Sequence, residues 1–111
     1  MALQHVQLAA GKWFRFSLAE QLGNIGSEVH RVTTWRGKDE AIARGAFTRA
    51  LELTDLTLRD PRHRNRLKEI ARLRELLCDA AADSHSYRTT IDDIDHYLTQ
   101  FAVLARNPVV R

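Results

Sequence analysis

Apolar residues recur along this chain at alternating steps of four and three, and this spacing limits its fold more than any other feature does. The first run comprises Leu18, Leu22, Ile25, Val29 and Val32. Residues three and four positions apart share one face of an α-helix, so the run predicts a helix with one buried side. We expect the aromatic residues Trp13, Phe14 and Phe16 to open this helix and Gly37 to end it.

Two further helices are predicted from their caps. Asp39 can accept a backbone N–H group and so begin a second helix. That helix must end before Pro61, because the residue before a proline is pushed out of the α region. Asp60 then caps a third helix with almost no loop, since Pro61 fits a first helical position, where no N–H donor is needed.

A fourth helix is expected after the polar segment 83–88, with Thr90 as its cap and Asn107 at its end. Four amphipathic helices with short connections predict an all-α fold, and more narrowly an antiparallel up-and-down four-helix bundle. A chain of 111 residues has room for one core. We expect an N-terminal arm at 1–11, the bundle at 12–107 and a C-terminal tail at 108–111. The side chains expected to be nearly fully buried are Leu22, Ile25, Leu53, Ile70, Leu73, Leu77, Leu98 and Phe101.

Two glycines, Gly23 and Gly26, interrupt the first predicted helix. Each costs about 1 kcal/mol relative to alanine inside a helix. A cost of this size indicates a packing reason, and we expect another helix to approach closely at these positions.

Composition narrows the class of protein. No run approaches the ~18 apolar residues of a membrane span, and the first residues lack the pattern of a signal peptide. The single Cys78 has no partner for a disulfide within the chain. We therefore expect a cytoplasmic, bacterial-type protein in a reducing compartment.

The positive charge of the chain is concentrated in residues 59–74. These sixteen positions hold seven of the seventeen Lys and Arg residues and only two acids, Asp60 and Glu69. The stretch carries a net +5, so the total of +3 leaves −2 for the other 95 residues. Six of the seven basic residues are arginines, whose planar guanidinium group grips phosphate and stacks on bases better than an ammonium group does.

This stretch predicts a patch that contacts the phosphates of RNA or DNA, because the start of a helix also offers free N–H groups to an anion. The predicted contact residues are Arg59, Arg62, Arg64, Asn65, Arg66, Lys68, Arg72 and Arg74. Two alternatives stay open. The stretch is also consistent with a solvated helical face, and with a contact to the acids Asp92, Asp93 and Asp95 of a neighbouring subunit.

Metal binding and catalysis find little support in the sequence. Asp93 and His96 form one acid–histidine pair at helical spacing, whereas a carboxylate di-metal site needs such a pair on each of two helices. Three residues separate Arg59 from His63 and seven separate Arg88 from His96. Neither spacing matches the Arg–His motif of small helical RNases and toxins. We therefore assign no catalytic residue, no metal ligand and no cofactor.

The segments LAEQLGNIGSE at 18–28 and RALEL at 49–53 resemble a group of small bacterial four-helix proteins. The group comprises proteins encoded in intervening sequences of large-subunit ribosomal RNA genes and Avd, the accessory protein of diversity-generating retroelements. Gln21 and the pair Asn24–Ile25 match the group's pattern, whereas the acid that follows arrives one residue late.

The resemblance implies a cyclic homo-oligomer of four-helix protomers with a basic surface for nucleic acid. For the retroelement relative it also implies contact with a reverse transcriptase. It implies no catalytic residue.

Together these observations favour a non-enzymatic, nucleic-acid-binding accessory protein. The first alternative is a protein–protein interaction bundle, such as an antitoxin-like scaffold, whose arginines meet an acidic protein. The second alternative is a small helical RNase or toxin. We also expect a homo-oligomer with Trp13 and Phe14 in or near its interface, because so many large apolar groups lie off the predicted seams.

Overall fold

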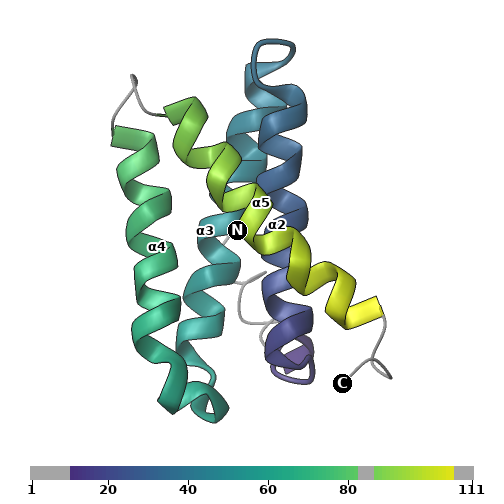
Figure 1. Ribbon diagram of the computed structural model, residues 1–111, viewed down its shortest axis with the longest axis vertical. Coiled ribbons are helices and arrows are strands. Elements are labelled where there is room, and N and C mark those ends of the chain that lie inside the picture. Colours follow the sequence, from purple (N-terminus) through teal and green to yellow (C-terminus); the bar gives the residue numbers. More distant parts are fainter. Residues whose placement is uncertain (1–10, 83–86, 107–111) are drawn as a thin grey trace.

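The computed structural model describes residues 11–82 and 87–106 of the chain, and every regular element in these ranges is helical (Figure 1). The elements are α2 (Leu18–Trp35), α3 (Glu40–Arg59), a 3-10 helix η1 (Pro61–Arg66), α4 (Leu67–Ala82) and α5 (Tyr87–Arg106). Gly11 to Trp13 are also helical and are followed by a turn. The prediction of an all-α fold is confirmed. The predicted arm and C-terminal tail lie almost wholly outside the described residues.

Each long helix packs mainly against two others. Helix α2 packs against α3 and α5, and α4 packs against the same two helices. Figure 1 shows α3 turning sharply into α4 at the lower end, whereas α5 crosses α2 obliquely. This crossing is steeper than the shallow one that a seam of period 3.5 predicts.

The first long helix begins later than the aromatic run suggested. Ser17 is its N-cap, and its side-chain oxygen accepts the N–H of Glu20 at 3.1 Å. The Glu20 carboxylate in turn accepts the N–H of Ser17 at 2.8 Å, which completes a capping box. The prediction that Trp13, Phe14 and Phe16 open this helix is therefore wrong. The Ser-x-x-Glu signal at 17–20 was legible in the sequence and marks the true start.

The next boundaries follow the predictions. Gly37 comes two residues after the end of α2 and has a φ of +79°, a left-handed conformation that glycine adopts without strain. The Asp39 carboxylate accepts the N–H groups of Ala41 and Ile42 at 3.1 and 3.2 Å and so caps α3. Helix α3 ends directly before Asp60.

The starts of the last two helices differ from the predictions. Asp60 is indeed a cap, but it caps the six-residue η1 rather than a continuous α-helix. His63 breaks the helical geometry within η1, with φ −104° and ψ 26°, and α4 begins only at Leu67. Helix α5 begins at Tyr87, so the prediction of a cap at Thr90 is wrong.

One hydrophobic core joins all four long helices. Six of the predicted core residues are buried to 5% exposure or less, namely Leu22, Ile25, Ile70, Leu73, Leu77 and Leu98. Leu53 and Phe101 are only half-buried, because they pack against the edge of this core.

The two glycines of α2 lie where α5 crosses it. A Cβ atom on Gly26 would fall 2.9 Å from the Cβ of Leu98. A Cβ atom on Gly23 would fall 3.0 Å from the Cα of Ala102. Both distances are shorter than ordinary carbon contacts, so the prediction of a close helix approach is confirmed.

Candidate nucleic-acid interface

The lower corner of the fold, where α3 turns into η1, is built around a buried amide. Gln21 is fully buried, and its Nε2 donates to the backbone oxygen of Trp13 at 2.8 Å and to Oδ2 of Asp60 at 3.1 Å. These two bonds leave the amide oxygen facing Nε2 of the buried His63, 2.8 Å away. Since that oxygen can only accept, His63 holds a proton on Nε2.

The indole of Trp13 fixes the chain before α2 to this corner. Its Nε1–H donates to Oγ1 of Thr57 at 3.0 Å, and Thr57 donates its own proton to the backbone oxygen of Leu53 at 2.9 Å. Trp13 is only 5% exposed. Its ring therefore belongs to the core of this chain, and the exposed-patch reason for placing Trp13 in an oligomer interface does not hold. Phe14 is half-buried against the same core, and its place in an interface stays a prediction.

Asp60 and Arg62 form the charged part of the corner. The guanidinium Nε lies 3.0 Å from Oδ1 of Asp60 and an Nη lies 2.5 Å from Oδ2, while the Arg62 backbone N–H also donates to Oδ1 at 3.0 Å. These hydrogen bonds, with that from Gln21, hold the pKa of the Asp60 carboxyl well below its ordinary value. Arg62 also donates to the backbone oxygen of Phe16 at 2.6 Å. Its guanidinium group is therefore occupied by hydrogen bonds within the protein, although the sequence predicted it to contact phosphate.

Three more of the predicted contact residues have acidic partners. Arg66 donates to Glu69 from two nitrogens, the second at 3.2 Å. Arg74 lies 2.5 Å from a carboxylate oxygen of Asp55. Arg72 lies 3.6 Å from one of Glu75, and both of these side chains are about two-thirds exposed. The Arg72 pair is the weakest of the three, since exposed pairs at this distance contribute little.

The remaining predicted residues are available to solvent. Arg59, Arg64 and Lys68 are exposed and make no ion pair with the residues the structure describes, and Asn65 is exposed beside them. They follow one another through the end of α3, η1 and the first turn of α4.

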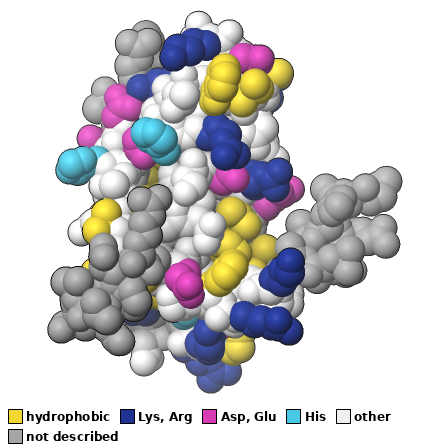
Figure 2. All heavy atoms as spheres, turned by 90° about the vertical axis from the view of Figure 1, so that its right-hand side faces the viewer, with side chains coloured by type: hydrophobic (Ala, Val, Ile, Leu, Met, Phe, Trp, Pro, Cys, Tyr) yellow, Lys and Arg dark blue, Asp and Glu magenta, His cyan; other side chains and the backbone are white. Residues whose placement is uncertain are grey.

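Lys12 and Arg15 lie at the same end of the molecule, and they were not among the predicted contact residues. Both are exposed, and within the described ranges neither forms an ion pair. The bond from Trp13 to Thr57 and the bond from Arg62 to Phe16 bring them beside the end of α3. Figure 2 shows Lys and Arg side chains gathered at this lower end. The partners lie more than forty positions apart in the chain, so no local pattern could have predicted the grouping. We call Lys12, Arg15, Arg59, Arg64 and Lys68 the basic end.

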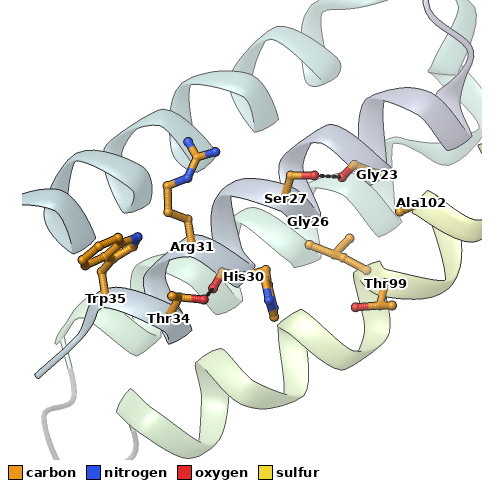
Figure 3. Close-up of a pocket in the computed structure, with 10 residues that line it drawn as sticks. Gly23, Gly26, Ser27, His30, Arg31, Thr34, Trp35, Thr99 and Ala102 are labelled. Carbon is orange, nitrogen blue, oxygen red and sulfur yellow. Dashed lines mark hydrogen bonds between the residues drawn. The ribbon is translucent and has the colours of Figure 1, made fainter. Parts of the chain in front are cut away.

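A second surface feature is an open groove of about 430 Å³ between α2 and α5 (Figure 3). Its floor is Gly23, Gly26 and Ala102, and His30 on its rim lies 3.1 Å from the Asp95 carboxylate. The hydroxyl groups along it donate to the backbone of their own helices, as Ser27 and Thr34 do in Figure 3. The groove thus results from the close approach of two helices.

No three His, Cys, Asp or Glu side chains of the described ranges lie together as metal ligands would. No helix in those ranges is both apolar and long enough to cross a bilayer.

Comparison of the chain with protein-family models, with curated proteins and with solved structures gives no match in any of the three. The resemblance to the four-helix accessory proteins therefore rests on the sequence segments alone.

Proposed function

We propose that this protein binds nucleic acid without catalysing a reaction, and that the basic end contacts the phosphates. One observation carries the proposal: five exposed cations from two separate stretches of the chain, 12–15 and 59–68, gather at one end of the molecule. Phosphate contacts of this kind depend little on base sequence and weaken strongly with salt.

The neighbouring acids support this assignment because each already has a partner. Asp60 is bonded to Arg62, Glu69 to Arg66, and Glu20 to the N-cap of α2. Arg62 and Arg66 therefore balance the charges of Asp60 and Glu69, so these two acids do not neutralise the five cations of the basic end. Phe16 is 36% exposed beside them and offers a ring on which a base can stack.

The architecture fits this role as a rigid support. We propose that α2 to α5 form an antiparallel up-and-down four-helix bundle, to which the turn around Trp13 is attached. The sequence resemblance adds an expectation of a reverse-transcriptase partner, for which the basic end would present the RNA or DNA.

The proposal is tested by binding at two salt concentrations. A fluorescent 20-nucleotide RNA and a duplex DNA of equal length are titrated with protein, and anisotropy is read at about 50 and about 200 mM salt. We expect micromolar binding at the lower salt. Replacing Arg64 and Lys68 with Glu is expected to weaken binding at least tenfold and to lower the salt slope by about 2, one for each lost contact.

Variants at other positions test whether the basic end is the surface that binds nucleic acid. Lys12→Glu with Arg15→Glu should weaken binding to a similar degree, because the structure places both at the basic end. Arg44→Glu changes an exposed cation in the first half of α3 and should have little effect. Equal losses from Arg44→Glu, or no salt-dependent binding by the wild-type protein, would contradict the proposal.

A further inference from the structure

Helices α4 and α5 also leave a groove between them, and its lining is more apolar than that of the groove between α2 and α5. Leu73, Leu76 and Ile94 lie along this groove, and Tyr97 lies on its α5 side. Its upper part encloses about 260 Å³, and it continues past Tyr97 to Leu18 at the start of α2. Leu73 and Ile94 are buried floor residues, but Tyr97 is 44% exposed.

The apolar surface continues along α5 below Tyr97. Phe101 contacts Tyr97 edge-on, with 5.4 Å between ring centroids, and is half-buried. Leu104 lies seven positions after Tyr97, which places it on the same helical face, and it is 46% exposed. A stripe of large apolar groups along an open groove is the kind of surface that a partner covers.

The two rims of the groove carry opposite charges. Arg72 stands on the α4 rim and Asp93 on the α5 rim, and both line the upper part. Both are exposed, and no ion pair joins them across the groove. The one ion pair described for Arg72, to Glu75 on its own helix, is weak for the reason given above.

We infer that a second copy of this chain occupies the groove, related to the first by a two-fold axis that runs along it. A rotation about such an axis keeps every residue at its height and exchanges the two rims. Helix α4 of each copy then lies antiparallel on α5 of the other, which brings the rim that carries Arg72 onto the rim that carries Asp93 of the second copy. Tyr97 of each copy meets the other's Leu73 and Leu76. The contact is self-complementary in both charge and apolar surface, as a two-fold interface requires.

This arrangement has a consequence for the proposed function, although it does not depend on it. An axis along the helices leaves the lower ends of both copies on the same side. Two basic ends would then lie next to each other and offer ten cations instead of five.

The test is a charge exchange read by molar mass. Sedimentation equilibrium or light scattering is performed from about 1 to about 200 µM, a range that covers the affinities of weak and moderate dimers. The wild-type protein should move from the monomer mass of 12.7 kDa to twice that mass. Arg72→Asp and Asp93→Arg should each raise the dimer Kd at least tenfold, because each sets like charges against each other twice. The double variant should return to within about threefold of the wild type.

Two controls keep the result interpretable. Arg44→Asp makes the same charge change on α3 and should leave the Kd unchanged, and circular dichroism should show equal helicity for all variants. Tyr97→Asp should abolish the dimer. A monomer at the highest concentration, an odd-numbered assembly such as a trimer or pentamer, or a double variant as weak as the single ones would overturn the inference. A failure of RNA and DNA binding would leave it standing, because mass and binding are measured separately.

Discussion

Helices α2 and α4 occupy contrasting positions in the same fold. Helix α2 meets α5 through glycines so closely that an added Cβ at Gly26 would clash with Leu98. Its first turns are also fixed by the buried amide of Gln21. Helix α4 instead leaves an apolar groove against α5, and its polar face is held by exposed or half-exposed ion pairs such as Arg74–Asp55.

The two helices differ in how much surface they leave for a partner. The amide of Gln21 is buried and bonded, so this amide offers no surface to a partner. Open contacts leave both apolar area and unpaired charge. The proposed sites therefore lie on the second kind of surface, and the first kind supports them.

The largest expected loss of stability comes from truncating the side chain at the centre of the α2–α5 contact. Leu98 is fully buried, so Leu98→Ala should lower the free energy of unfolding by about 2–5 kcal/mol through lost burial and a cavity. Leu76→Ala, in the half-buried wall of the groove, should cost about 1 kcal/mol or less. Urea denaturation at low micromolar concentration measures both. Equal losses of unfolding free energy from the two variants would mean that the α2–α5 and α4–α5 contacts are packed alike.

A smaller effect is expected at the corner that anchors α2. Asp60→Asn should cost about 2 kcal/mol at neutral pH, because a charged acceptor of several hydrogen bonds is lost. Asp55→Asn, which removes a half-exposed pair, should cost less than about 1 kcal/mol.

The pH dependence of the stability of Asp60→Asn gives a second measure of this corner. The pKa of Asp60 is lower in the folded protein than its ordinary value of 3.8, and the hydrogen bonds from Arg62 are the main cause. The stability it contributes is therefore fully present above about pH 4 and is lost as the pH falls towards the folded pKa. Urea midpoints measured between about pH 5 and about pH 2 should fall less steeply for Asp60→Asn than for the wild type. Parallel curves would contradict the assigned role.

The smallest expected changes in stability concern one glycine of α2 and one of α3. Gly26→Ala gains about 1 kcal/mol of helix preference but must push Leu98 away, so we expect a net loss of about 1 kcal/mol. Gly45→Ala has open space around the new methyl group and should gain up to about 1 kcal/mol. Melting temperatures of the two variants should therefore shift in opposite directions, and a stabilising Gly26→Ala would show that α5 yields easily.

The sequence predicted those parts of the fold that depend on neighbouring residues. Asp39, Gly37 and the proline after Asp60 set the boundaries of α2 and α3 through local hydrogen bonds and allowed dihedral angles. The spacing of apolar residues predicted most of the core. Leu53 was placed too deep because a helical seam does not show where the edge of a core lies.

Not all of the predicted contact residues remain available in the folded chain. Counting charges identified Arg62 and Arg74 as contact candidates, but their acidic partners occupy them once the chain is folded. Lys12 and Arg15 joined the site only because Trp13 bonds to a hydroxyl 44 positions later. Contacts of that range depend on tertiary packing and leave no mark in a local pattern.

The position of Trp13 also has a spectroscopic consequence. The chain has two tryptophans, and they mark opposite ends of α2. Trp13 lies in the core at the corner, whereas Trp35 is 36% exposed and lines the groove against α5. Their fluorescence emission should differ in wavelength, with a blue-shifted signal from the buried Trp13 and a red-shifted signal from the partly exposed Trp35. Without any added label, the first would report whether the corner is intact, and quenching of the second would report whatever enters the groove.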